Sequence, residues 1–336
     1  MDASRITIKT LAKLAGVDVS TISRALNDSP RVKPETIKRI KDLANEVKYY
    51  PNTLAQGLVT SKTKTIGVVI PRIENAYYAE IFAGIEQVLA VKGYTLLLGI
   101  SHYSKKQEAE VIELFLSRNV DGVILLSGIN PGSVTVWKNA SRAPIVLIDQ
   151  DIYLHDVDSV ACDIINGVGL AVDHLVSLGH QEIAYINDNV TSETRYNAFR
   201  KKMAGLGMKN EPHYVRSDFM YEKGGYEGAV ELMKYENKPT AIFCANDYMA
   251  IGALKALEDI GLKVPEDISV VGFDDSYMLN YLLKSLTTVR QPKEELGRRA
   301  AMVLLERISE GAGNIMIEHI LLKPELIVRN STGSKK

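Results

Sequence analysis

The first side chains of this chain that could recognise a partner lie between positions 7 and 27 and carry hydroxyl, amide and guanidinium groups. Asp18 is a plausible N-cap, and a helix starting there leaves Val19, Ser20, Ser23 and Arg24 on one face. A guanidinium can donate two hydrogen bonds to a guanine, and hydroxyls can bond to base edges or phosphates. This face therefore has the chemistry to read a DNA major groove.

Two short amphipathic segments must position that face. Apolar residues recur at helical spacing on both sides of Gly16, at positions 8, 11, 12 and 15 before it and 17, 22, 25 and 26 after it. A third helix is predicted from Pro34 to Tyr49, with Pro51 ending it. A single glycine between two helices also fits a generic helical hairpin, but the context favours a helix-turn-helix.

Charge is divided unevenly along the chain. Residues 1–64 carry a net charge of +6 and the remainder carries −7, within a total of −1. A basic end on an acidic body is the asymmetry expected when that end contacts phosphate groups.

From residue 66 onward, short apolar runs alternate with amphipathic helical segments. Runs typical of buried parallel strands occupy 66–70, 95–100, 122–126, 145–148, 183–186, 241–244 and 268–273. Helical patterns occupy 79–92, 105–118, 167–178, 223–235 and 249–260. A chain of 336 residues is too long for one compact core. We therefore expect an α/β protein with a helix-turn-helix head and two doubly wound parallel-sheet lobes separated by a cleft.

Polar and aromatic residues follow several of these runs, at the sheet edge where doubly wound folds bind ligands. They are Tyr77, Tyr78, Asp149, Arg195, Phe219, Asn246, Asp247, Asp274 and Asp275. Aromatic faces suit the apolar face of a pyranose or a purine, and the polar groups suit hydroxyls or carbonyls. Structural roles are open as well: helix capping for Asp149, Asp274 and Asn246, burial for Tyr77 and Phe219, and an ion pair for Arg195.

The stretch from Thr7 through PNTLAQGL (51–58) and TIGVVIP (65–71) resembles the lactose-repressor (LacI) family of bacterial transcription regulators, and the resemblance covers essentially the whole chain. It implies that Val19, Ser20 and Arg24 make or support base contacts. Thr7, Thr21 and Asn27 are expected to position phosphates instead. Leu58 matches the leucine that enters the minor groove from a hinge helix, although the preceding Gly57 lowers helix propensity by roughly 1 kcal/mol. The family's effector contacts match Tyr77 or Tyr78, Asp149, Arg195, Phe219, Asn246 and Asp275.

The resemblance also implies a domain organisation. The expected parts are a head at 1–50, a hinge helix and linker at 51–64, and a core at 65–332. Chains of the family cross between lobes near 162, 291 and 322, so lobe 1 would comprise 65–162 plus 292–321, and lobe 2 would comprise 163–291 plus 322–332. The C-terminal NSTGSKK carries no leucine heptad, which favours a homodimer on a pseudo-palindromic double-stranded DNA operator.

We therefore expect a repressor of a metabolic operon, controlled by a small-molecule effector bound between the lobes. A sugar or sugar derivative is our first choice, because carboxylates and an amide around an aromatic face suit a polyhydroxylated ring. A purine is the alternative, since ENAYY at 74–78 resembles the purine-responsive branch of the family. A cytoplasmic sugar-binding protein without operator specificity is the alternative from another class.

Enzyme signatures are missing from the sequence. It contains no GxxxxGK[ST], HExxH or GxSxG motif, and the glycines at 167 and 169 begin a dinucleotide fingerprint that fails at Val172. We expect no cofactor and no metal, and Cys162 and Cys244 as reduced core residues. The start of the sequence lacks a signal-peptide pattern and no run of 18 apolar residues occurs, so we expect a cytoplasmic protein without a membrane partner.

Overall fold

The computed structural model describes residues 6–50, 62–126, 130–148, 154–188, 193–208, 214–281, 285–310 and 316–335. The contacts divide the chain into two units, Met1–Thr63 and Lys64–Lys336, and each is described by itself. We call the first unit the head and the second the core.

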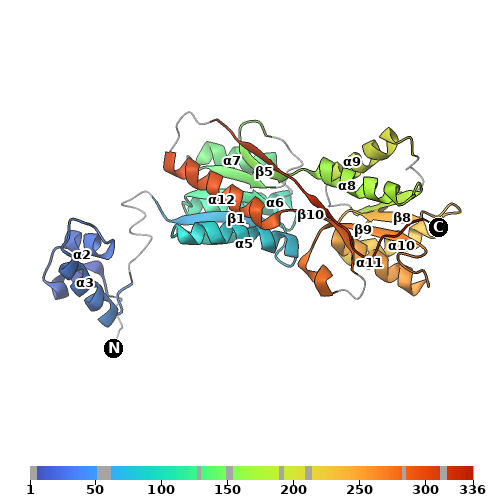
Figure 1. Ribbon diagram of the computed structural model, residues 1–336. Coiled ribbons are helices and arrows are strands. Elements are labelled where there is room, and N and C mark those ends of the chain that lie inside the picture. The colour runs from blue at the N-terminus through green and yellow to red at the C-terminus, as the bar shows by residue number, and fades with distance from the viewer. Residues whose placement is uncertain are drawn as a thin grey trace. The chain divides into compact units, whose positions relative to one another are not determined.

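The head contains α1 (Ile8–Ala15), α2 (Val19–Leu26) and α3 (Pro34–Glu46), which pack around the fully buried side chains of Leu11, Ile22 and Ile40. Gly16 ends α1 with φ 67°, a left-handed conformation that a Cβ atom disfavours, and its N–H bonds back to the carbonyls of α1. The predicted helix-turn-helix is therefore present (Figure 1).

One local prediction for the head is wrong, and another is confirmed only in its position. The third helix ends at Glu46 rather than Tyr49, because Lys48 adopts φ 51° and the Tyr49 N–H bonds to the Ala44 carbonyl at 2.8 Å, which closes the last turn. Asp18 occupies the N-cap position of α2, but its side chain makes no capping hydrogen bond.

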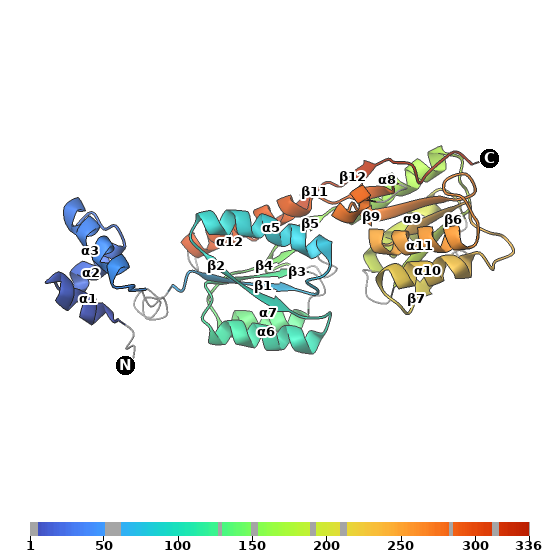
Figure 2. The same ribbon diagram turned by 90° about the horizontal axis from the view of Figure 1, so that it is seen from below.

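The core is built on two six-stranded sheets, which define lobe 1 and lobe 2. The sheet of lobe 1 has the order β11-β5-β4-β3-β1-β2, and all its pairs are parallel. Its strands are β1 (Thr65–Ile70), β2 (Thr95–Ile100), β3 (Gly122–Leu126), β4 (Ile145–Ile148), β5 (Asp158–Cys162) and β11 (His319–Leu322). One face is covered by α5 (Ala76–Val91) and α12 (Lys293–Glu310), the other by α6 (Lys105–Ser117) and α7 (Pro131–Ala140) (Figure 2).

The sheet of lobe 2 has the order β12-β10-β9-β8-β6-β7, parallel except for the pair of β12 with β10. Its strands are β6 (Ile183–Asp188), β7 (Tyr214–Ser217), β8 (Ala241–Cys244), β9 (Ser269–Asp274), β10 (Thr287–Arg290) and β12 (Glu325–Ile327). Its helices are α8 (Ile164–Ser177), α9 (Glu193–Gly205), α10 (Tyr221–Leu232) and α11 (Asp247–Asp259). The doubly wound fold predicted from the alternating pattern is thus confirmed for both lobes.

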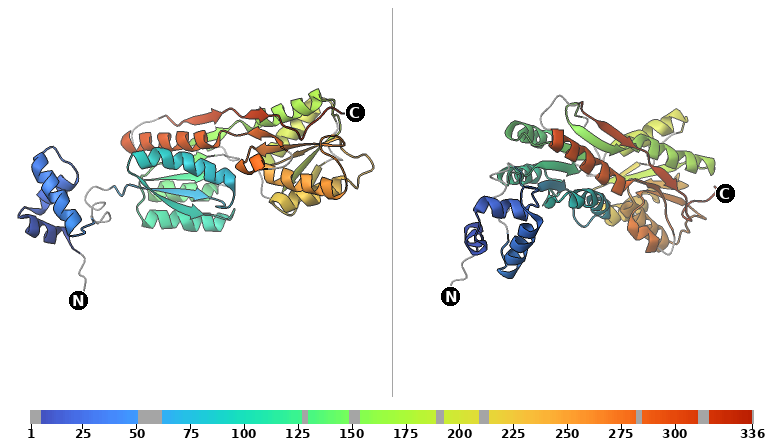
Figure 3. Two further views of the ribbon diagram at one scale, coloured as in Figure 1. Left: turned by 60° about the horizontal axis from the view of Figure 1, so that its bottom comes forward. Right: turned by 60° about the vertical axis from the view of Figure 1, so that its left-hand side comes forward.

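The chain passes between the two sheets three times, between β5 and α8, between β10 and α12, and between β11 and β12. Figure 3 shows the last passage, where the C-terminal segment leaves the sheet of lobe 1 and joins that of lobe 2. In lobe 1, α5 and α12 approach closely at two glycines. A Cβ at Gly84 would lie 2.1 Å from the Glu294 carbonyl oxygen, and one at Gly297 would lie 2.0 Å from that of Ile81.

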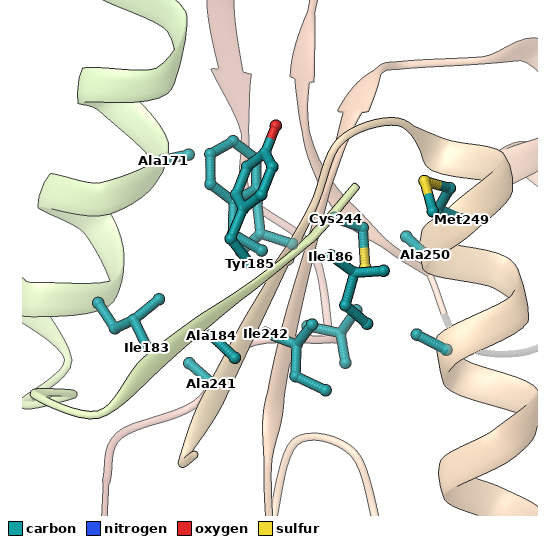
Figure 4. Packing of buried hydrophobic residues seen from close by; sticks show 14 of the residues in the cluster. Ala171, Ile183, Ala184, Tyr185, Ile186, Ala241, Ile242, Cys244, Met249 and Ala250 are labelled. Carbon is teal, nitrogen blue, oxygen red and sulfur yellow. The ribbon is translucent and has the colours of Figure 1, made fainter. Parts of the chain in front are cut away.

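The interior of lobe 2 contains a row of aromatic rings across one face of the sheet. Tyr185 of β6 packs edge-on against Phe243 of β8, and Phe243 stacks on Phe273 of β9. Figure 4 shows the neighbouring apolar side chains, including Cys244. Both cysteines are free and buried, as predicted. A Cβ at Gly167 would lie 3.0 Å from the Phe273 ring, so this glycine serves the close packing of α8 on the sheet.

Candidate functional site

The outward face of α2 presents the side chains that we predicted to contact DNA bases. Val19 is 39% exposed, and Ser20 and Arg24 are exposed, whereas Ile22 and Ala25 on the opposite side are fully buried. The packing of the head therefore holds this polar face toward solvent.

The other predicted head residues have local structural contacts. Thr7 is the N-cap of α1, and its Oγ1 accepts a hydrogen bond from the Thr10 N–H at 3.2 Å. Asn27 donates from Nδ2 to the Ser23 carbonyl at 2.9 Å, at the end of α2. Thr21 and Ser23 are half-buried. Two further predicted residues, Leu58 as a hinge contact and Asp149 as an effector contact, lie outside the described residues.

A buried ion pair lies at the carboxyl edge of the sheet in lobe 2. Arg195, in the first turn of α9, places Nη2 3.2 Å from Asp274 Oδ1, and both side chains are 8% exposed. Its Nη1 donates to the Ala245 carbonyl at 2.6 Å, and its guanidinium lies 4.2 Å from the centre of the Phe273 ring. The guanidinium is therefore fixed from two sides, and the charge buried there is compensated.

A short relay of hydrogen bonds joins this pair to lobe 1. Gln291, in the passage between β10 and α12, donates from Nε2 to Asp274 Oδ1 at 2.7 Å. The Tyr77 hydroxyl, from α5 of lobe 1, donates to Gln291 Oε1 at 3.5 Å. Tyr77, Gln291, Asp274 and Arg195 thus form one connected set across the junction of the lobes, which we call the junction relay.

Tyrosine hydroxyls make a second connection between the lobes. Tyr103, after β2, lies 3.1 Å from the Tyr78 hydroxyl and 3.4 Å from that of Tyr221 in lobe 2. The Tyr248 hydroxyl of lobe 2 accepts from the Ala76 N–H of lobe 1 at 3.2 Å. Tyr103 and Tyr221 adopt φ 57° and 58°, and such backbone strain persists only where the surroundings enforce it. Burial and the neighbouring tyrosines raise the pKa of Tyr103, so it bonds as a neutral hydroxyl.

Lys293 forms a third connection and is almost fully buried. Its Nζ donates to the Asp274 carbonyl at 2.9 Å and to the Asp275 carbonyl at 2.8 Å. The same Nζ lies 3.1 Å from Glu80 Oε2 on α5. One ammonium group therefore ties the strand end that carries Asp274 to a helix of the other lobe.

The structure places Asp275 in an ion-pair cluster rather than at the junction relay. Its Oδ2 accepts from Arg290 Nε at 2.7 Å, and its Oδ1 accepts from Arg329 Nη2 at 2.7 Å. Burial raises its pKa, but the hydrogen bonds from the two arginines outweigh this effect, and the net pKa is lowered. Both carboxylate oxygens have structural partners, so the carboxylate that meets Arg195 is the preceding residue, Asp274.

The remaining predicted residues divide between structural and exposed positions. Asn246 caps α11, because its Oδ1 accepts from the Met249 N–H at 2.9 Å. Asp247 is fully buried and accepts from the Thr288 hydroxyl and the Ser276 N–H at 2.6 Å each. Burial, and then the charge of Asp274, raise the pKa of Asp247 to about 8. Phe219 is 41% exposed, and the Lys223 ammonium lies 3.3 Å from its ring centre.

Sequence reasoning missed several residues at the junction. They are Glu80, Tyr103, Tyr221, Tyr248, Gln291 and Lys293. Tyr103 and Tyr248 follow β2 and β8, so the rule that ligands bind beyond strand ends could have found them. Gln291 and Lys293 follow β10, a strand that the apolar pattern did not predict.

The fold and these sites define a class of protein: a helix-turn-helix head joined to a two-lobed core of the kind that binds small ligands. Comparisons with known proteins agree. Residues 7–52 match bacterial regulatory proteins of the lacI family, and residues 172–332 match a periplasmic binding protein-like domain. The HTH-type transcriptional repressor PurR of Pasteurella multocida is 33% identical over 98% of this chain and 99% of its own length.

Solved structures extend the likeness to nearly the whole chain. The lac repressor dimer bound to operator and the anti-inducer ONPF has a TM-score of 0.88 and 25% identity, covering 98% of this chain and all of its own. A complex of the transcriptional regulator CelR with cellobiose has a TM-score of 0.73, 29% identity and coverage of 97% of this chain and 100% of its own. A regulator from Enterococcus faecium with bound ribose has a TM-score of 0.72 and 30% identity over 81% of this chain and 100% of its own.

This chain belongs to the LacI family of bacterial transcription regulators. It is a DNA-binding regulator and not an enzyme, as the sequence predicted. Within the described ranges, no helix has the length and apolar character needed to cross a membrane.

Proposed function

We propose that this chain is a cytoplasmic, homodimeric repressor of a metabolic operon that binds a pseudo-palindromic operator and is controlled by a sugar or sugar derivative. The observation that carries the effector assignment is the junction relay, which links Tyr77 of lobe 1 to Asp274 and Arg195 of lobe 2. A carboxylate, an amide and a guanidinium suit the hydroxyls of a sugar. A ligand that replaces these contacts favours one lobe arrangement over another and so alters DNA binding.

The proposed effector contacts are Tyr77, Tyr78, Arg195, Phe219, Asn246 and Asp274, together with Asp149. We give Asp274 the role that sequence analysis assigned to Asp275, because Asp274 is the one of these two residues whose carboxylate meets Arg195. We assign base contacts to Val19, Ser20, Ser23 and Arg24, phosphate contacts to Thr7, Thr21 and Asn27, and the minor-groove wedge to Leu58.

The proposed domain limits are a head at 1–50, a hinge and linker at 51–64, and two lobes formed by 65–162 with 292–321 and by 163–291 with 322–332. Strand pairing supports these limits, because β11 pairs with β5 in lobe 1 whereas β12 pairs with β10 in lobe 2. A dimer with one head on each half-site is supported by the lac repressor dimer, which has the same fold and is bound to operator.

A purine effector is the second candidate. It is favoured by the 33% identity to PurR repressors over nearly the full length of both chains. A carbohydrate is favoured by the polar junction relay and by the neighbours solved with cellobiose and with ribose.

A thermal-shift experiment with D-ribose, cellobiose and hypoxanthine tests the effector class. Any ligand that binds only the native state stabilises it by about 2.7 kcal/mol at a concentration of 100 Kd. We expect a carbohydrate to raise the Tm of the wild type and hypoxanthine to leave it unchanged. Stabilisation by hypoxanthine alone would favour the purine alternative, and no shift with any of the three would contradict both classes tested.

A further inference from the structure

A buried amide close to the junction relay has no hydrogen-bond partner among the described residues. Asn187 is only 1% exposed, and neither its Oδ1 nor its Nδ2 is hydrogen-bonded, although Asp188 beyond it begins a stretch whose side chains are not described. Buried polar groups in native proteins are almost always hydrogen-bonded, because leaving them unpaired is costly. A group of this kind calls for a partner that the described part of the chain does not supply.

The position of Asn187 points to the effector site. Tyr185, Phe243 and Phe273 share one face of the sheet in lobe 2, and Arg195 covers the Phe273 ring on that face. Side chains two residues apart on a strand point to the same face, so Asn187 continues the row of Tyr185 toward the carboxyl edge.

The register of the sheet brings the two groups together. Ile186 pairs with Cys244, so the next residues, Asn187 and Ala245, lie side by side. The Ala245 carbonyl accepts the hydrogen bond from Arg195 Nη1 at 2.6 Å. The unpaired amide therefore lies on the strand next to the carbonyl that holds Arg195, at the edge where Arg195 meets Asp274.

We propose that Asn187 is a further ligand-contacting residue, and that its amide selects a hydroxyl group of the effector. This inference rests on the proposed carbohydrate site. A sugar hydroxyl both donates and accepts a hydrogen bond, and the amide offers one acceptor and two donor hydrogens. Arg195 offers donors and Asp274 offers an acceptor, so Asn187 adds to the site a group that does both.

The competing explanation is a buried water molecule that satisfies the amide in the free protein. The two explanations predict opposite effects of replacing the amide by an apolar group of similar size. If the amide is unpaired, Asn187→Leu removes a cost and the Tm of the effector-free protein stays the same or rises. If water satisfies the amide, the same change loses hydrogen bonds and the Tm falls.

The test measures Tm without ligand and the Kd for D-ribose and for cellobiose by calorimetry. It compares the wild type with Asn187→Leu and with Asn187→Ala, a smaller replacement that cannot overpack the site. Asn197→Leu, on the exposed side of α9, is the matched control. We expect the carbohydrate that binds the wild type to bind both Asn187 variants at least 10-fold more weakly. The control should bind as the wild type does, and the Tm of Asn187→Leu should not be lowered.

Three results would contradict the inference, and they are distinguishable. Wild-type affinity in both Asn187 variants would remove Asn187 from the site while leaving the proposed function intact. A Tm lowered by more than about 4 °C in both variants would mean that the amide is satisfied without ligand. Failure of the wild type to bind either carbohydrate would overturn the proposed effector class and this inference with it.

Discussion

Two adjacent carboxylates, Asp274 and Asp275, have different surroundings, and from this difference we infer different roles. Asp274 faces Arg195 and Gln291 at the lobe junction, whereas Asp275 holds Arg290 and Arg329. We predict that Asp274→Asn weakens effector binding at least 10-fold, because a neutral amide cannot replace the carboxylate opposite Arg195. Asp275→Asn should leave the effector Kd within about twofold of the wild-type value. If calorimetry instead shows weaker binding for Asp275→Asn and wild-type binding for Asp274→Asn, then Asp275 is the effector contact.

The same pair gives a prediction about pH. The pKa of Asp275 is lowered in the folded state, so its ion pairs stabilise the protein above the unfolded pKa near 3.8 and lose their effect as pH falls through the folded value. Asp275→Asn should therefore lower the stability by roughly 1–3 kcal/mol at pH 7, and by less as the pH falls below about 4. Thermal melts of the wild type and Asp275→Asn at pH 7, at pH 4 and at lower pH should show the Tm difference between them shrinking. A Tm difference that stays constant with pH would contradict the prediction.

In the head, we predict that Arg24 contacts DNA bases. Its side chain is exposed on the face of α2 opposite Ile22. Arg24→Ala should weaken binding to the selected operator by roughly 1–3 kcal/mol and barely change binding to random DNA. Equal losses on both DNAs in a titration at fixed salt concentration would mean that Arg24 contacts phosphate only.

For individual residues, the sequence predicted which types of side chain lie near the lobe junction but not which contacts they make. The choice between Asp274 and Asp275 depends on Arg329, which lies 54 residues further along the chain. Strand alternation alone does not reveal such a contact. The cap at Asn246 was an open alternative in the sequence, and the structure shows it directly.

At the scale of elements, strands with continuous apolar runs were predictable and the others were not. The sequence located β1 to β4, β6, β8 and β9 to within two residues. It missed β5, β7, β10, β11 and β12, which are three to five residues long and carry polar residues such as Asp158, Arg216 and Thr287. These are mostly edge strands or strands at passages between lobes, where neighbouring segments rather than an apolar run determine the pairing.

Among the helices, α7, α9 and α12 were missing from the predicted segments, although α12 is the longest described helix, with 18 residues. Its first residue, Lys293, links the strand end at Asp274 to Glu80 of α5. Because β1 follows the head in the sequence and α5 follows β1, we expect a displacement of α5 on effector binding to influence the head.

We predict that Lys293→Met reduces this coupling. Methionine keeps an unbranched side chain that is one heavy atom shorter, but removes the ammonium that contacts both lobes. The effector Kd should change only a few-fold, while the effector-induced change in operator affinity, about 5- to 150-fold in coupled systems, should fall toward onefold. Operator titrations with and without effector measure this ratio, and an unchanged ratio would exclude Lys293 from the coupling.

For the whole molecule, the sequence predicted the division into a basic head and a two-lobed core, from the distribution of charge along the chain and from the βαβ pattern. We propose that a small molecule bound between the lobes changes sequence-specific DNA binding by the head.

The most direct measurement is fluorescence anisotropy of the full chain on an operator selected from random DNA, with and without the effector found by thermal shift. We predict that the protein prefers the selected operator to scrambled DNA by at least 10³-fold and that the effector changes this affinity at least 5-fold. The effector should be recovered chemically unchanged. Equal affinity for operator and scrambled DNA, or an operator affinity that no bound ligand alters, would contradict this proposal.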